Sequence, residues 1–456
     1  MSAPLFLVTV PFVLGLITFL MRRWPQIAGP VAAGAAWLVA LVLRGYELSP
    51  ETSGASWELF GQVLALTERS QQLLVAVYML IGIIVLLSAF YDQGDKFVAL
   101  SLATLSPLSA ALMVESIAIG AVLIFIAAGG MAMLIQGSRA GSTLAALRFF
   151  SLVALAMPLL LVAGWMIGSD QYQFPDTVTL MILVSLLLLT TAFPFQIWVA
   201  PVVRESSSLA TSVVYGLGQL VVLFYCLKLL VDQPFVFGSS EFQTVLSLSA
   251  AATLLLGAVL TMTARSFGHQ LGYLLLLSIG AVTAVIGSGD AAVVEAAVTL
   301  LLLRVIALII AGVGLAMVRT RALSVAGGVS QYAANQGLAW RAPLAIGLFA
   351  FGSFSLAGLP LTPGFAGSWP AVVVVARNTP WLAAILVLSI AGGAFGVIRR
   401  LIPLLSHPED PAHDQNVVTE SKQEQVIGGV ILGAAVLVTI FPRIILAFAS
   451  NLADLF

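Results

Sequence analysis

The chain has 456 residues, of which 60% are hydrophobic and 9% are charged, and its formal net charge is −1 at pH 7. Soluble domains carry about 25% charged residues, so the composition excludes a soluble globular protein and gives no indication of a nucleic-acid partner. The apolar runs are long and continuous, unlike the short alternating strands of a membrane barrel. Because lipid offers the backbone no hydrogen bonds, these runs predict an all-α integral membrane protein.

Apolar runs of about 17–25 residues predict about fourteen membrane-spanning helices. In chain order these are Pro4–Met21, Ile27–Leu43, Leu73–Tyr91, Phe97–Val114, Ile117–Gln136, Leu144–Ile167, Thr177–Trp198, Leu209–Val231, Val245–Thr263, Leu271–Ile286, Ala291–Val318, Pro343–Arg377, Trp381–Ile398 and Val426–Ala449. We expect a single membrane domain made of N-terminal helices (1–91), a first five-helix repeat (97–231), a second, inverted one (245–398), a polar cytoplasmic linker (401–425) and a last helix (426–449).

The distribution of lysine and arginine predicts the orientation of the chain, because these residues favour cytoplasmic loops. Loops after odd-numbered spans hold twelve of them, and loops after even-numbered spans hold four. The first set is Arg22, Arg23, Lys96, Arg139, Arg204, Arg265, Arg319, Arg321, Arg341, Arg399, Arg400 and Lys422; the second is Arg44, Arg69, Lys228 and Arg377. We therefore expect both termini on the non-cytoplasmic side of a bacterial-type inner or plasma membrane.

Proline interrupts two of the expected spans. The seventh contains "AFPFQIW" with Pro194, and the twelfth contains "AGLPLTPGF" with Pro360 and Pro363. Proline removes a backbone donor and clashes with the preceding turn, so a helix ends or bends there. Broken helices at matching places in two halves are typical of transporters built from inverted repeats. An ordinary proline kink remains the alternative for each.

Two arginines lie inside apolar spans. Arg304 falls near the middle of the eleventh span, where a charge costs at least ~2.5–3.5 kcal/mol on insertion scales and must face protein or water. It is either part of a hydrated ion path or a structural group paired with a carboxylate or with carbonyl groups. Arginine keeps its proton, which favours an electrostatic or structural role over direct proton relay. Arg148 lies one helical turn inside the sixth span, and its side chain can extend to the membrane interface.

The remaining polar candidates are distributed along the chain. Glu115 is expected at the outer interface, and His269 opens the tenth span, where a histidine can relay protons near neutral pH. Gln196 and Gln219 are candidates to line a wet path or to join helices. The single cysteine, Cys226, excludes a disulfide or cysteine cluster, and no metal or redox cofactor is expected. His407 and His413 lie in the polar linker, where no helix or strand fixes a metal-binding spacing.

Four motifs then carry a resemblance to a known family. The segments "AFPFQIWVAPVVRESSSLATSVVYG", "LGYLLLLSIGAVTAVIG", "LLLRVIALIIAG" and "FGSFSLAGLPLTPGFAGSW" resemble, in this order, signatures of the antiporter-like membrane subunits of respiratory complex I, which are related to Mrp antiporters and membrane-bound hydrogenases. The resemblance implies a fourteen-span scaffold with other membrane-arm subunits as partners and protons as the transported ion. It also implies a line of lysines, histidines and a glutamate across the bilayer centre.

The chain departs from the family pattern where titratable residues are expected. The family lysine before the first break falls on Leu189, and the histidine of that break falls on Gln196. The other family positions fall on Gly268 (beside His269), Leu300, Arg304, Ser368 and Arg148, and there is no carboxylate between Glu115 and Asp170. The resemblance thus implies a retained scaffold with a depleted proton axis, and conduction that is weak or rerouted.

Three functions follow as hypotheses. The first is an antiporter-like proton-translocation subunit of a complex I-type oxidoreductase, without a redox centre of its own. The second is a structural membrane-arm subunit that does not conduct, which predicts a dry interior around Arg304. The third is a stand-alone cation or proton transporter, which the absence of a dedicated substrate cluster disfavours.

Overall fold

The computed structural model describes residues 2–48, 55–59, 61–137, 142–168, 175–290, 292–325, 337–406 and 420–456. These ranges are almost entirely helical. The helices are α1 (Ala3–Leu20), η1 (Met21–Arg23), α2 (Pro25–Arg44), α3 (Glu68–Ser88), α4 (Phe97–Met113), α5 (Ile117–Gly137), α6 (Thr143–Gly168), α7 (Pro175–Thr190), η2 (Gln196–Trp198), α8 (Val199–Glu205), α9 (Ser208–Thr211), η3 (Ser212–Gly218), α10 (Gln219–Asp232), α11 (Pro234–Phe237), α12 (Ser240–Thr263), α13 (Phe267–Gly287), α14 (Val293–Val325), α15 (Leu338–Arg341), α16 (Pro343–Ala357), α17 (Phe365–Asn378), α18 (Pro380–Leu405), α19 (Lys422–Ile440) and α20 (Arg443–Ala453).

Eleven helical segments of the described chain are long and apolar enough to cross a membrane, and four further apolar helices are shorter. The protein is therefore an integral, multi-pass membrane protein, as the composition predicts. The count of fourteen spans stays a prediction, since it is reached only when the shorter helices α4, α7 and α16 are added to the eleven and α20 is counted with α19. The shorter pieces include α7 and α16, the first halves of the two interrupted helices.

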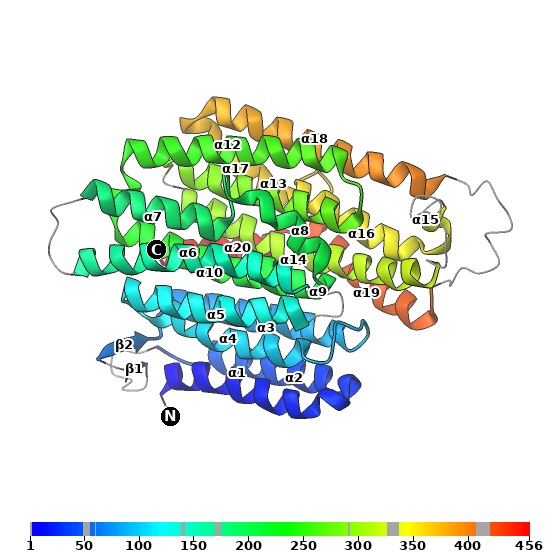
Figure 1. The fold of residues 1–456 in the computed structure, drawn as a ribbon, viewed down its shortest axis with the longest axis horizontal. Coiled ribbons are helices and arrows are strands. Elements are labelled where there is room, and N and C mark those ends of the chain that lie inside the picture. Colours follow the sequence, from blue (N-terminus) through cyan, green and yellow to red (C-terminus); the bar gives the residue numbers. More distant parts are fainter. Residues whose placement is uncertain are drawn as a thin grey trace.

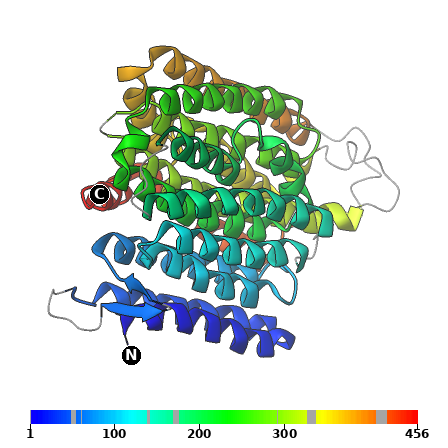
Figure 2. The same ribbon diagram turned by 60° about the vertical axis from the view of Figure 1, so that its left-hand side comes forward.

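The helices lie side by side with their long axes roughly parallel (Figure 1). The first helices of the chain form one side of the bundle, α12 and α18 form the opposite side, and α14 lies between them. Both chain ends lie at the same end of the helices, in Figure 1 and after the rotation in Figure 2. This placement agrees with an even number of crossings.

Burial divides the helices into an inner and an outer group. In the spans Ser208–Asp232, Phe267–Gly287 and Val293–Arg319, 94% of the most apolar window is buried inside the protein. The corresponding share is only 28% for the first span and 11% for Lys422–Ile440. The outer helices therefore present much of their apolar surface to lipid, whereas the three inner spans are surrounded by protein.

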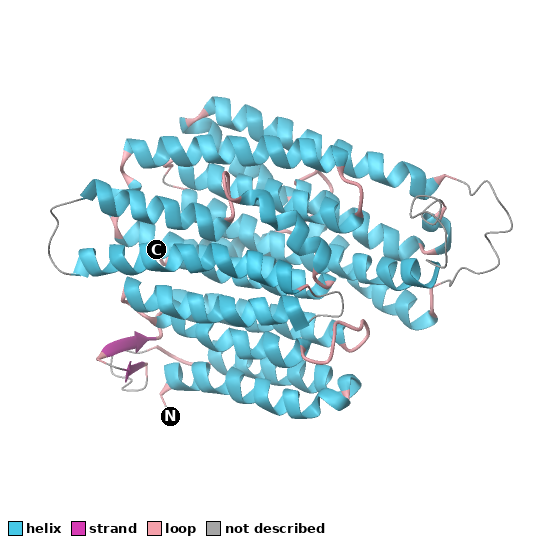
Figure 3. Cartoon of the chain, in the orientation of Figure 1, coloured by secondary structure: helices cyan, strands magenta, loops and turns pink. Residues whose placement is uncertain are grey.

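The structure adds one small element to the predicted all-α fold. Strands β1 (Ser56–Leu59) and β2 (Gln62–Ala65) form an antiparallel hairpin between α2 and α3 (Figure 3), with Ser56 opposite Ala65 and Leu59 opposite Gln62. An isolated bridge joins Leu64 to Val114. No strand was predicted here, because two four-residue strands produce little periodic signal.

The last span was expected as one helix over 426–449, and this is wrong. The structure divides it into α19 and α20 at Phe441 and Pro442. Proline cannot donate a backbone hydrogen bond and its ring clashes with the preceding turn, which ends α19 there. The linker of residues 401–425 is described only at its ends, and His407 and His413 lie outside the described residues.

Candidate functional site

The first helix break lies between α7 and α8, around Pro194. Thr191 has a left-handed backbone (φ 56°), and the helical hydrogen-bond pattern is lost from there to Phe195. The backbone groups freed at this break form hydrogen bonds with two side-chain hydroxyls of the neighbouring helix α12. Phe193 N–H donates to Thr253 Oγ1 at 2.8 Å, and Ser249 Oγ donates to the Phe193 carbonyl at 2.6 Å. Irregular backbone at membrane depth is thus satisfied by protein, as lipid requires.

The second break lies between α16 and α17, around Pro360 and Pro363. Gly358 (φ 84°) ends α16 in the left-handed conformation that glycine adopts without strain, and Leu361 is also left-handed (φ 66°). Serine side chains of α16 and α17 themselves form hydrogen bonds with the backbone of this break. Gly364 N–H donates to Ser355 Oγ at 2.9 Å, and Ser368 Oγ donates to the Gly358 carbonyl at 3.0 Å.

Arg304 lies beside the second break, on α14. It is eleven residues from the start of that helix, which places it about 16 Å along the axis and well inside the span. Its side chain is only 3% exposed. Its Nη2 donates to Gln219 Oε1 at 2.5 Å, whereas its Nε and Nη1 have no hydrogen-bond partner among the described residues. Glu295, nine positions earlier on the same helix, is exposed at a distance of about 13 Å along the axis and does not pair with it.

Gln219 comes from a locally unusual helix. Residues Ser212–Gly218 (η3) form a π-helix, and Gln219 is the first residue of the α-helix α10 that continues from it. A π segment changes the face that the following residues present, and such segments occur frequently at functional sites. Tyr215 of the same segment is buried and lies within electrostatic range of Arg304. Sequence periodicity does not distinguish a π turn from an α turn, so this feature was missed.

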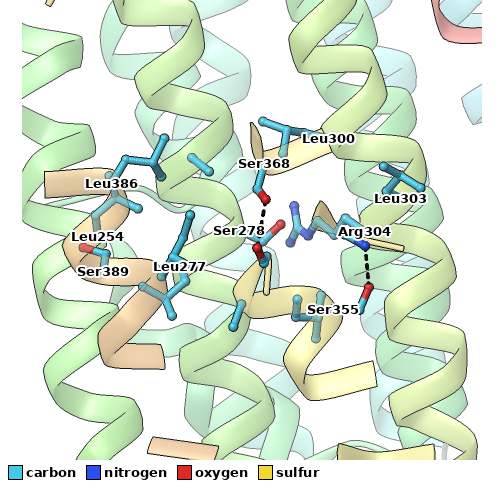
Figure 4. Close-up of a pocket in the computed structure, with 16 residues that line it drawn as sticks. Leu254, Leu277, Ser278, Leu300, Leu303, Arg304, Ser355, Ser368, Leu386 and Ser389 are labelled. Atoms are coloured by element: carbon cyan, nitrogen blue, oxygen red, sulfur yellow. Dashed lines mark hydrogen bonds between the residues drawn. The ribbon is translucent and has the colours of Figure 1, made fainter. Parts of the chain in front are cut away.

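A cavity of about 30 Å³ adjoins Arg304. Its polar lining consists of serine hydroxyls from four helices: Ser278 of α13, Ser355 of α16, Ser368 of α17 and Ser389 of α18. Figure 4 shows the guanidinium group directed towards Ser278 and Ser368. None of the described residues that line the cavity is acidic. The volume accommodates about two water molecules, each of which needs 10–15 Å³ by this measure.

The four serines were not predicted as site residues. They are isolated polar residues in apolar runs, and their sequence positions give no indication that they meet. The available signal was weak: a buried serine inside a span is common and usually bonds its own helix. Ser389 is an exception, because its buried Oγ has no hydrogen-bond partner.

Of the six predicted polar candidates, the structure joins only Arg304 and Gln219. Arg148 is half-buried and lies over the Trp198 ring, 5.0 Å from its centroid, next to the first break. His269 is half-buried at the start of α13, with its Nδ1 3.0 Å from Ser266 Oγ and its ring stacked on Tyr273. These residues make local contacts and do not line the cavity beside Arg304.

Gln196 and Glu115 also lie away from that cavity. Gln196 is half-buried in η2, and no described residue forms a hydrogen bond with its Oε1. Glu115 is exposed between α4 and α5, where it lines a separate pocket together with Lys228 and Arg69. The interfacial position of Glu115 stays a prediction. Among the residues that the structure describes, no group of three or more His, Cys, Asp or Glu side chains could hold a metal ion.

Other positions of the expected proton axis are closely packed. Leu189 and Leu300 are buried. At Gly268, a Cβ atom would lie 2.9 Å from the Arg204 Cα and 3.2 Å from Arg319 Nη2. Arg319 Nη1 donates to the Ser206 carbonyl at 2.7 Å, so its guanidinium group already occupies the space beside Gly268. Serine at 368 uses its hydroxyl for the second break.

Two interrupted helices and a buried cation define a class of protein: a multi-pass membrane protein with helix breaks of the kind found in membrane transport proteins. The model of the transmembrane family of NADH:quinone oxidoreductases and Mrp antiporters matches residues 119–392, and the chain belongs to this family.

Relatives and solved structures agree with this assignment. NADH-quinone oxidoreductase subunit N of Psychrobacter arcticus is 26% identical over 246 residues, which cover 53% of this chain and 49% of the relative. The same subunit of a Nocardioides species is 27% identical over 282 residues, which cover 59% and 52%. The matched part of the chain thus spans about half the length of these relatives.

The fold is shared with subunits of larger membrane assemblies. A chain of respiratory complex I from Thermus thermophilus superposes with a TM-score of 0.77 at 21% identity, covering 99% of both chains. A chain of the Mrp complex of a Dietzia species gives 0.81 at 16% identity, with 99% of this chain and 96% of that chain covered. A chain of an archaeal membrane-bound sulfane sulfur reductase gives 0.82 at 14% identity, with coverage of 100% and 98%.

Proposed function

We propose that this protein is an antiporter-like subunit in the membrane arm of a complex I-type or Mrp-type assembly, with proton translocation that is weak or rerouted. Family membership and the shared fold support the first part. The surroundings of Arg304 support weak or rerouted translocation. Arg304 is a permanent cation that is hydrogen-bonded to Gln219, and the cavity beside it is lined by hydroxyls instead of further titratable groups. The hydroxyls and the water that the cavity accommodates can pass protons by hydrogen bonds.

The proposed roles of the helices follow from their order. Helices α4, α5, α6, α7–α8 and α10 make a first repeat, and α12, α13, α14, α16–α17 and α18 make a second. The fourth member is interrupted in each, which supports the inverted relationship. Both chain ends lie at one end of the helices, which supports two termini on the same side of the membrane.

In this proposal, the arginine at position 304 limits proton conduction. Lysine can lose its proton when it is buried, whereas arginine stays charged, so Arg304 biases protons electrostatically and does not carry them. Gly268, Leu189, Leu300 and Ser368 add no titratable group. The proposed path therefore has one fixed charge near its centre and lacks the alternating acids and bases that a fast relay uses.

Proton flux into proteoliposomes that contain the purified complex tests this proposal. R304K introduces a titratable group and is expected to raise the flux, and R304A is expected to abolish the residual flux. R443A is the matched control, because Arg443 is exposed at the start of α20. Equal flux in all four proteins with normal assembly would contradict a transport role for Arg304.

A structural subunit that does not conduct is the second candidate. The small cavity volume and the close packing at Gly268 favour it. It predicts that R304A and R304K change the amount of assembled complex and leave proton flux per assembled complex unchanged. A stand-alone transporter would require activity of the isolated chain in the same vesicles.

A further inference from the structure

The cavity beside Arg304 has the properties of an anion site. The positive charge of Arg304 is buried, and the only protein partner described for it is the neutral amide of Gln219. A buried ion without a counter-charge costs several kcal/mol even after relaxation. Lysine would relieve this cost by losing its proton, but arginine cannot. A neutralising charge is therefore needed, and no described residue lining the cavity supplies it.

The backbone around the cavity does not replace that charge. The carboxyl end of α16 and the amino end of α17 both reach the cavity, at Gly358 and Gly364. Their helix dipoles have opposite signs at these ends, so they largely offset each other. The Gly358 carbonyl also already accepts a hydrogen bond from Ser368.

Several donors towards the cavity are free. Within the part of the chain that the structure describes, Arg304 Nε and Nη1 have no acceptor, and Ser389 Oγ, on a side chain that is 1% exposed, has no partner either. Ser355 Oγ accepts from Gly364 N–H, so its own O–H is still available. Ser278 lines the same space (Figure 4). A cation surrounded by hydroxyls that can donate matches an anion better than a second cation.

We propose that this cavity binds one small monovalent anion of the size of chloride, held by the Arg304 guanidinium group and by the hydroxyls of Ser278, Ser355 and Ser389. The volume of about 30 Å³, which by the same measure holds about two water molecules, fits a single-atom anion. The bound anion neutralises Arg304 and fixes the second helix break against α13 and α18. The site stands independently of whether the subunit conducts protons.

The test uses the full-length chain, purified in detergent with its copurifying subunits. Its unfolding temperature is measured while sodium chloride or bromide replaces sodium gluconate at constant ionic strength. We expect a saturable rise with either halide and an anomalous bromide peak next to Arg304 in crystals grown with bromide. A response that is linear in halide, or identical in gluconate, would overturn the proposal, and so would water alone at this position.

Variants separate this site from general salt effects. S278A/S389A is expected to raise the half-saturating chloride concentration roughly tenfold or more, because hydrogen bonds to a charged group are lost. S101A is the matched control, since Ser101 on α4 is also buried with an unpartnered hydroxyl and does not line the cavity. R304Q is expected to remove the saturable response. If R304Q does not fold, an unchanged response in S278A/S389A is sufficient to reject the site.

Discussion

Arg304 Nη2 and Gln219 Oε1 are hydrogen-bonded at 2.5 Å and join helices α14 and α10 in the interior of the protein, although 85 residues separate them in the chain. This bond connects the proposed first repeat to the proposed second one. It is also the only hydrogen bond described for the guanidinium group, so the pair is a well-defined place to test how the two halves are held together.

We expect Q219L to lower the free energy of unfolding by about 1.5–3 kcal/mol, the typical contribution of a hydrogen bond to a charged group. The leucine also leaves the third nitrogen of Arg304 without an acceptor. Unfolding of the purified chain in mixed detergent micelles measures the effect. Q423L is the control, because Gln423 is exposed near the start of α19; equal losses in both variants would contradict the role of the pair.

The first helix break depends on a threonine of α12. T253V keeps the shape of the side chain but removes the acceptor for Phe193 N–H, and a buried unsatisfied donor costs about 1–3 kcal/mol. T263V is the matched control on the same helix, since Thr263 is exposed and bonds only to carbonyls of its own helix. Unfolding free energies of the two variants should differ by at least about 1 kcal/mol. Similar values would show that the break is satisfied in another way.

The second break requires a glycine at position 364 for reasons of space. A Cβ atom there would overlap the Ser355 carbonyl oxygen, whereas at Gly347, on α16, a Cβ atom meets nothing within 4 Å. We expect G364A to destabilise the protein by about 1–3 kcal/mol through overpacking. G347A is expected to stabilise it by about 0.5–1 kcal/mol, the usual preference for alanine within a helix. Thermal unfolding of both variants tests the contrast, and a neutral G364A would refute the proposed close packing.

Arg319 forms hydrogen bonds with backbone carbonyl groups at the carboxyl end of α8. It donates to the Ser206 carbonyl at 2.7 Å and to the Arg204 carbonyl at 3.2 Å. We expect R319A to destabilise the protein by about 1.5–3 kcal/mol, because it removes charge-assisted hydrogen bonds. R265A, at an exposed arginine just before α13, should change the stability by less than about 0.5 kcal/mol. Comparable effects of the two would show that the contacts to α8 contribute little.

The sequence predicted the features that depend on local chemistry. The breaks at Pro194 and at Pro360 and Pro363 follow from the geometry of proline, and the burial of Arg304 follows from its place in a long apolar run. The residues that form hydrogen bonds with the backbone at these breaks were harder to predict. Phe193 is satisfied by side chains 56 and 60 residues further along the chain, and no local pattern connects them.

The partner of Arg304 shows the same limit. Arg304 was expected either in a hydrated ion path or paired with a carboxylate or carbonyl groups, and Gln219 was separately expected to line a wet path or to join helices; that the two residues bond to each other was not predicted. Gln219 faces Arg304 from the helix that follows the π segment, so its direction depends on backbone geometry that residue types do not encode. The serines around the cavity come from four helices and meet only after folding. The properties of single residues could be predicted from the sequence, whereas the meeting of residues from different helices could not.

The composition of α14 has a consequence for how the chain enters the membrane. Its span has the highest mean hydropathy of the described spans, 2.6, despite the arginine inside it. On translocon insertion scales, a central arginine costs about 2.5–3.5 kcal/mol, and each Leu, Ile or Val returns about 0.3–0.6 kcal/mol. Leucine, isoleucine and valine occupy nine of the eleven positions from 300 to 310, enough to offset the arginine. The segment is thus able to integrate on its own during synthesis, before α10 and the serine-bearing helices assemble around its charge.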